Sequence, residues 1–176
     1  MNLEQYGMTA EFAADALNED LKELLAGQLY RSSAGEKRAI RYFVNDLPVA
    51  TGNDEDRGEH AQEPYIVARI TEGNIPEGDA AQEAQIILVI CLYDDRPDRQ
   101  GYRDVLHIIQ EITARYCKNP VIRIRPGSAG ARGGPYTVKK PIQWAIWNDT
   151  KAHPYYLGAV EFQLEIPTIC PEVPFT

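Results

Sequence analysis

Seven consecutive apolar residues in the middle of the chain limit the possible folds more than any other feature. They lie at residues 86–92 (IILVICL), within a longer extended pattern over residues 83–93. A strand that is apolar on both faces belongs in the interior of a sheet that is covered, in part or in full, on both sides. The sequence therefore predicts a central strand over residues 83–93, with the other elements assembled around it.

Two helices and several further strands are predicted around this central strand. Residues 9–29 and 101–117 carry apolar side chains at steps of three and four, which is the period of an amphipathic helix. In the first helix, Thr9 is the expected N-cap, the pattern weakens at Gly27, and acidic residues that include Asp20 cover the face opposite the apolar stripe. Alternating apolar residues predict strands at residues 38–44, 64–71, 121–125, 136–147 and 156–166.

This order of elements predicts an α+β domain. We expect a mixed, mainly antiparallel sheet of four to six strands, with the two main helices packed on one face. A chain of 176 residues suits a single domain, 1–176, and its polar or glycine-rich stretches at residues 50–63, 74–82 and 126–135 are predicted to be mobile loops. No apolar run approaches the ~20 residues of a membrane-spanning helix. The N-terminus lacks the pattern of a secretory signal, so we expect a soluble protein with no membrane partner.

The residue types that carry out catalysis are scattered along the chain. Three histidines lie far apart in the sequence: His60, His107 and His153. Three cysteines match no metal-binding spacing and are expected unpaired, in or near the core: Cys91, Cys117 and Cys170. Their odd number favours a reducing compartment. The sequence therefore predicts no active site, no metal and no cofactor.

One acidic cluster invites a different interpretation. Asp94, Asp95 and Asp98 could attract a cation, but they follow a strand and precede a helix, where Asp ordinarily forms turns and caps. An enzyme whose residues converge only in the folded chain stays an open alternative. It would need a deep pocket that holds Asp94, Asp98 or His107 with shifted pKa values.

The charge of the chain is unevenly distributed. Between residues 112 and 148 there are seven basic residues and no acidic one, so this segment carries +7 and the remainder −15, for a net charge of −8. Five of these bases are predicted to contact a partner: Arg123, Arg125, Arg132, Lys139 and Lys140. In a ring of identical subunits, a basic surface on one copy can meet an acidic surface on the next. The alternative is a nucleic-acid-binding module over residues 112–148, in which the bases contact phosphates.

Three passages of sequence, taken in order, carry a resemblance. The first comprises Asp46-Leu47-Pro48 and Pro64-Tyr65-Ile66-Val67. The second comprises Val89-Ile90-Cys91-Leu92-Tyr93-Asp94 and Gln100-Gly101-Tyr102-Arg103-Asp104-Val105. The third comprises Pro141-Ile142-Gln143-Trp144, Pro154-Tyr155-Tyr156-Leu157-Gly158 and Ile166-Pro167. This order resembles the tail terminator (tail completion or minor tail) proteins of long-tailed bacteriophages and prophages. The resemblance covers residues from about 37 to 172, and the glycine-rich stretch at 126–135 departs from it like an insertion.

The resemblance implies a small α+β structural protein of the virion, without catalysis or a cofactor. Such a protein would assemble as a ring, expected to be a hexamer, on the head-proximal end of the tail tube, and would stop the tube from growing. Its partners would be copies of itself, the tail tube protein, and a head-completion or connector protein. DNA would only pass through the lumen, where acidic residues would keep it from sticking. The protein would occur in the host cytoplasm during assembly and then in the tail or neck of the virion.

Overall fold

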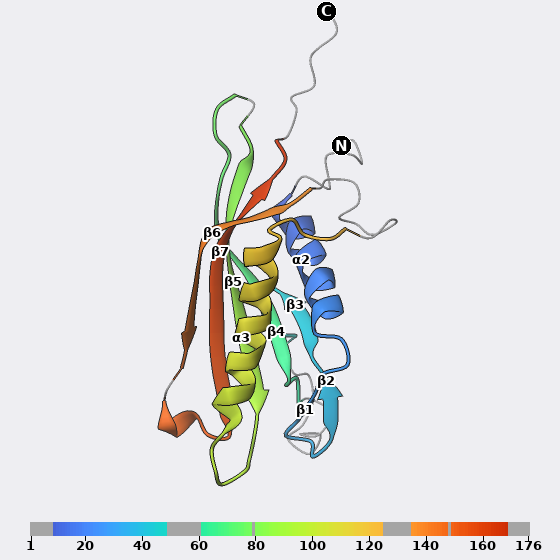
Figure 1. The fold of residues 1–176 in the computed structure, drawn as a ribbon, viewed down its shortest axis with the longest axis vertical. Helices are drawn as coiled ribbons and strands as arrows, with labels where there is room; N and C mark the ends of the chain where they lie inside the picture. The colour runs from blue at the N-terminus through green and yellow to red at the C-terminus, as the bar shows by residue number, and fades with distance from the viewer. Residues whose placement is uncertain (1–8, 49–60, 79, 125–134, 148, 169–176) are drawn as a thin grey trace, which may run out of the picture.

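The computed structural model describes residues 9–48, 61–78, 80–124, 135–147 and 149–168. Its N-terminal half contains α2 (Ala10–Leu24), β1 (Leu29–Arg31), β2 (Lys37–Ala39), β3 (Arg41–Val44), β4 (Tyr65–Asn74) and β5 (Gln82–Tyr93). These are followed by α3 (Gly101–Lys118), β6 (Thr137–Ile146), a short 3-10 helix η3 (Thr150–Ala152) and β7 (Tyr155–Ile166). Figure 1 shows how these elements lie along the long axis of the molecule.

A five-stranded sheet forms the centre of the fold. Its strand order is β3-β4-β5-β7-β6, with β3 and β4 parallel and every other neighbouring pair antiparallel. The predicted central strand is confirmed, because β5 lies between β4 and β7 in the middle of the sheet. The helices α2 and α3 lie side by side against the sheet, and β1 and β2 form a separate two-stranded sheet (Figure 1). The predicted α+β class, with a mixed, mainly antiparallel sheet, is confirmed.

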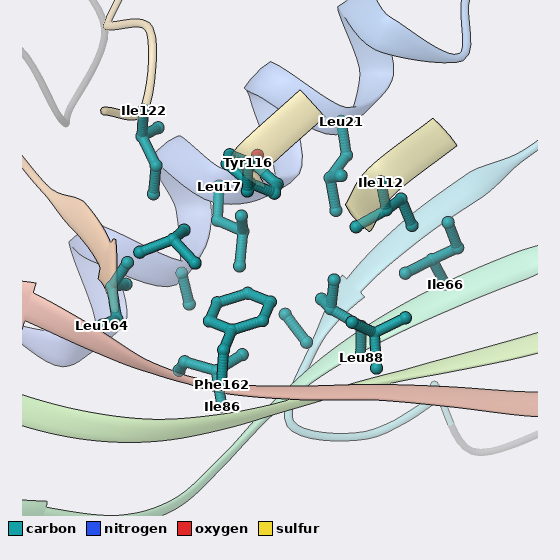
Figure 2. Packing of buried hydrophobic residues seen from close by; sticks show 14 of the residues in the cluster. Leu17, Leu21, Ile66, Ile86, Leu88, Ile112, Tyr116, Ile122, Phe162 and Leu164 are labelled. Carbon is teal, nitrogen blue, oxygen red and sulfur yellow. The ribbon is translucent and has the colours of Figure 1, made fainter. Parts of the chain in front are cut away.

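The hydrophobic core lies between the sheet and the two helices. Alternate residues of β5, including Ile86 and Leu88, point toward the helices and are fully buried. Figure 2 shows Phe162 of β7 directed at side chains of α2 and α3, where its ring centroid lies 6.1 Å from that of Tyr116. The apolar stripes of both helices are therefore explained by one shared layer of packing.

The opposite face of the sheet is less well covered. On β5, Ile87 and Val89 lie on this second face and are only partly buried, whereas their neighbours on the first face are inaccessible to solvent. The apolar run at residues 86–92 is thus covered fully on one side and in part on the other, which is one of the two outcomes that the sequence left open. We call this second side of the sheet the open face.

The structure corrects several predicted boundaries in the N-terminal half. The first helix ends at Leu24, and the chain turns at Gly27, whose φ of 82° is readily adopted only by glycine. Leu29 therefore begins β1, where it is exposed, and does not continue the helix. The strand predicted at residues 38–44 is interrupted at Ile40 and divides into β2 and β3, which belong to different sheets. Thr9 is confirmed as the N-cap, since its side chain accepts a hydrogen bond from the N–H of Phe12.

Two corrections concern other predicted elements. The strand predicted at residues 121–125 is reduced to a single bridge between Val121 and Thr137 at the start of β6. Of the predicted loops, residues 50–60 and 126–134 lie outside the described residues, and the loop at 74–82 is a shorter connection between β4 and β5. Neither α2 nor α3, the two α-helices in the described parts of the chain, has the length and apolarity of a membrane-crossing helix.

Candidate interaction surface

Four of the five predicted contact residues flank the glycine-rich stretch, within which Arg132 lies, and the structure brings the two flanks together. The N–H of Ile122 donates to the carbonyl of Tyr136 at 2.9 Å, and the N–H of Val138 donates to the carbonyl of Pro120 at 2.8 Å. Arg123 therefore lies on one side of this pairing and Lys139 on the other. Arg125 and Arg132 fall outside the described residues.

Arg123 is attached to the first helix of its own chain. Its Nε lies 3.2 Å from Oδ1 of Asp20, and its Nη1 lies 3.5 Å from Oε1 of Glu23. The side chain remains 52% exposed, so a partner can still reach one side of the guanidinium. These ion pairs fasten the segment after α3 to α2, which is a structural role that the sequence did not reveal.

Asp20 is the centre of this arrangement, and its position corrects the sequence analysis. The side chain is fully buried, although the sequence assigned it to the solvent face of the first helix. Its carboxylate accepts hydrogen bonds from Arg115 Nη2 at 3.1 Å and from the hydroxyl of Tyr116 at 2.8 Å. Burial and the neighbouring carboxylate raise the pKa of Tyr116 well above its usual value, so this hydroxyl stays protonated and donates. A buried carboxylate needs this number of donors to offset its lost hydration.

The two lysines belong to the edge strand β6. Lys139 Nζ forms an ion pair of 2.6 Å with Oε2 of Glu165 on the adjacent β7, and this pairing raises the pKa of the lysine. Lys140 is exposed and is followed by Pro141, at the place where the register between β6 and β7 shifts. Charged residues and proline on an edge strand hinder its pairing with the edge of another sheet.

These contacts change the interpretation of the basic segment. Three of its seven bases, Arg115, Arg123 and Lys139, form ion pairs with carboxylates of the same chain. Fewer bases are therefore available for a phosphate backbone than the sequence alone indicates.

The sequence held one signal for the contacts of Asp20. This residue lies three positions after Leu17 and four before Leu24, in register with the apolar stripe of the helix.

A pocket of about 260 Å³ lies between the small sheet and the N-terminal end of α3. Asp94 and Asp104 line it, whereas Asp98 and His107 do not. Two hydrogen bonds from Arg96, at 2.7 and 2.9 Å, hold the pKa of Asp94 below its ordinary value. Burial raises the pKa of Asp104. The side chain of Asp94 is thus occupied in closing the turn before α3, as the sequence predicted for this cluster.

Other groups with possible chemistry lie apart from this pocket. His107 Nε2 lies 2.8 Å from Oε1 of Glu111, one turn along α3. Cys91 is buried, whereas Cys117 is exposed, which corrects the prediction that it lies in or near the core; Cys170 and His60 fall outside the described residues. Within the described ranges, no group of three or more His, Cys, Asp or Glu side chains could hold a metal ion.

The comparisons with known proteins concern the fold alone. No family model matches the sequence, and no curated protein matches it. Several solved structures match, and one of them, of a protein whose name states no function, has a TM-score of 0.53. The match covers 94% of this chain and 99% of that chain, with 13% sequence identity. A likeness at this level of identity indicates a shared α+β fold and says nothing about activity or partners.

Proposed function

We propose that this chain is a structural protein of a phage or prophage tail, acting as tail terminators do. Copies of it form a ring, expected to be a hexamer, on the head-proximal end of the tail tube. The ring stops the addition of tube subunits and offers a surface to the head-completion or connector protein. The chain performs no chemistry in this role, and DNA only passes through the lumen.

The observation that carries this proposal is that parts of the three passages behind the sequence resemblance lie side by side in the folded sheet, on β4, β5 and β7. Residues 65–67 of the first passage pair in register with residues 89–91 of the second, across β4 and β5. The N–H of Asp94, in the second passage, donates to the carbonyl of Pro154, in the third, at 2.9 Å. The passages are therefore parts of one structural unit, although they are far apart in the sequence.

Two glycines show how tightly the second and third passages pack. A Cβ added at Gly101 would lie 2.5 Å from the ring of Tyr156, and one added at Gly158 would lie 2.5 Å from a methyl group of Val105. Both positions demand a residue without a side chain, because real Cβ contacts are longer than this. The second and third passages contain these two glycines, so their residues are matched to this particular packing. The match between sequence and packing supports the family resemblance.

The open face and the surface charge are compatible with assembly. Partly exposed apolar side chains such as Ile87 and Val89 share the open face with polar ones, among them Gln85, whose amide donates to Glu161 at 2.7 Å. A surface of mixed polarity is typical of interfaces between subunits that also exist as free monomers. The acidic excess of the chain would serve electrostatic contacts or the lining of the lumen.

The proposal is tested by assembling tail tubes in vitro. Purified tube protein from the same phage or prophage genome is polymerised with and without this chain, and a gold-labelled version of the chain is located by electron microscopy. We expect label at one end of each tube, shorter tubes as the chain is added, and six copies per labelled end by native mass spectrometry. Label spread along the tubes, or tubes of unchanged length with no label, would refute the proposal.

A further inference from the structure

An aromatic pocket lies where β6 ends and β7 begins. Its volume is about 240 Å³, and four aromatic side chains line it: Tyr102, Trp147, Tyr155 and Tyr156. Among the described residues, Trp147 is 64% exposed, Tyr155 41% and Tyr102 37%, so three of the large exposed hydrophobic side chains gather around this one hollow. Exposed hydrophobic residues are usually scattered singly over a protein surface. A group of exposed aromatic residues around one hollow is therefore typical of a binding site.

The walls of the pocket are held in place by contacts within the chain. The backbone N–H of Trp147 donates to the carbonyl of Leu157 at 2.9 Å, which continues the pairing of β6 with β7. Tyr155 stacks edge to face on Tyr93 with 5.5 Å between the ring centroids, and His153 Nδ1 lies 3.2 Å from the hydroxyl of Tyr156. A site that is ordered before binding loses less entropy when a ligand arrives.

The chemistry of this pocket fits a proline-rich segment. Grooves lined by Tyr and Trp bind extended polyproline II segments, in which proline rings pack on the aromatic faces. The chain itself contains such a P-x-x-P segment, Pro171-Glu172-Val173-Pro174, which lies outside the described residues. Its prolines restrict the unbound backbone, so that little further entropy is lost on binding.

The charges also match. The exposed Arg99 lines the pocket, and Glu172 stands between the two prolines of the segment. Asp149 lines the pocket too, but its carboxylate already accepts the N–H of Lys151 at 2.9 Å. An acidic residue on the ligand can therefore pair with Arg99.

The segment cannot reach the pocket of its own chain. The pocket lies where β7 begins, and the segment follows β7 in the sequence; the two ends of this strand lie at opposite ends of the long axis (Figure 1). At ~3.3 Å per residue β7 spans roughly 36 Å, whereas the six residues that follow Thr168, up to Pro174, span at most about 20 Å. Only the pocket of another copy lies within reach.

We propose that the aromatic pocket of one copy binds the segment of residues 171–174 of a second copy. Pro171 and Pro174 pack on the rings of Trp147 and Tyr155, and Glu172 pairs with Arg99. The contact joins different surfaces of the two chains, which makes it heterologous. Two copies can exchange their segments, or many copies can form a closed ring or an open filament. It does not rest on the proposed tail function, because a chain with any role can associate in this way.

Binding is measured with a fluorescent peptide of residues 167–176, in which Ser replaces Cys170. The receptor is the full chain with P171A and P174A, whose own segment no longer competes. We expect saturable binding that Trp147→Ala weakens about tenfold or more, as is typical of a central aromatic contact. Trp144→Ala is the matched control, since this exposed tryptophan lies on β6, three residues before Trp147, but does not line the pocket. A peptide with both prolines replaced by alanine should bind as weakly as the wild-type peptide binds the Trp147→Ala receptor.

Self-association of the full chain provides the second measurement. Sedimentation velocity over a range of concentrations should show weaker association for Trp147→Ala and for the double proline variant, with no further loss when the two are combined. Circular dichroism spectra identical to wild type verify that each variant is folded. Failure of the peptide to bind, equal binding by the Trp147 and Trp144 variants, or a wild-type chain that stays monomeric throughout would each overturn the proposal. Loss of this contact with tube capping intact would leave the proposed function standing.

Discussion

Replacing Asp20 by Asn should destabilise the fold more than its place on an acidic helix would indicate. The substitution keeps the shape of the side chain and removes the charge that Arg115 and Arg123 neutralise. Arg123 is half exposed, and water can replace its ion pair at a cost of ~1 kcal/mol or less. Arg115 has a side chain only 9% exposed, so its guanidinium would lose its counter-charge in a buried position.

The expected magnitude follows from these contacts. Removing one partner of a buried ion pair costs about 3–5 kcal/mol. The lower end of this range applies, because Arg115 also donates to the backbone carbonyls of Asn119 and Val121 and keeps these bonds in the variant. A loss of about 3 kcal/mol lowers the melting temperature of a chain of this size by roughly 6–12 °C.

The free energy of unfolding is measured by urea titration at pH 7. Asp15→Asn is the matched control, since it is the same chemical change on the same helix. Burial and the nearby Glu11 and Glu19 raise the pKa of Asp15, so its charged form weakens the fold at pH 7 and its removal should be neutral or slightly stabilising. If Asp20→Asn and Asp15→Asn had free energies of unfolding within about 1 kcal/mol of each other, the reasoning from burial would be wrong.

Further predictions concern packing, acid stability and thiol chemistry. Gly158→Ala places a methyl group against α3 and should lower the free energy of unfolding by roughly 1–3 kcal/mol, measured by urea titration; an unchanged midpoint would contradict the close packing. The pKa of Asp94 is lowered from 3.8 by its hydrogen bonds to Arg96, so its ionised carboxylate stabilises the fold above pH 3.8, and this stabilisation is lost as the pH falls through the folded-state pKa. Asp94→Asn should therefore lower the urea midpoint at pH 7 by more than it does in acid below pH 3.8, and equal effects at both pH values would argue against this role. Burial raises the pKa of Cys91 to about 11, so at pH 8 a maleimide should modify the exposed Cys117 long before Cys91, as peptide mass mapping would show; equal rates would mean that the core opens readily.

Local patterns in the sequence were sufficient for most of the main sheet and both helices. The periods of two and three to four residues reflect which side chains are buried, and burial follows directly from the alternation of β5 and β7 and from the stripe of α3. The ends of the helices and strands were harder to predict where a turn interrupts a run of regularly spaced apolar residues. Leu29 matched the helical stripe, but Gly27 had already turned the chain, and the break at Ile40 divided one predicted strand between two sheets.

The candidate surface could be predicted only in outline. The sequence identified the basic segment around residues 112–148, and the resemblance to tail terminators stays a prediction. It did not show that Arg115 and Tyr116 bind Asp20, because these residues are 95 and 96 positions away from it in the chain. It also did not show that Tyr102, Trp147 and Tyr155 line one pocket, since α3, β6 and β7 meet there only after the sheet has formed.

The amino-acid sequence by itself therefore determined the two helices, the strands β4 to β7 and the central position of β5, because these depend on hydrophobic periodicity between neighbours in the chain. The tertiary structure alone decided which charges are paired, which face of the sheet stays open and where the aromatic side chains gather. These properties depend on distances between residues that are remote in sequence, and such distances exist only once the helices have packed against the sheet.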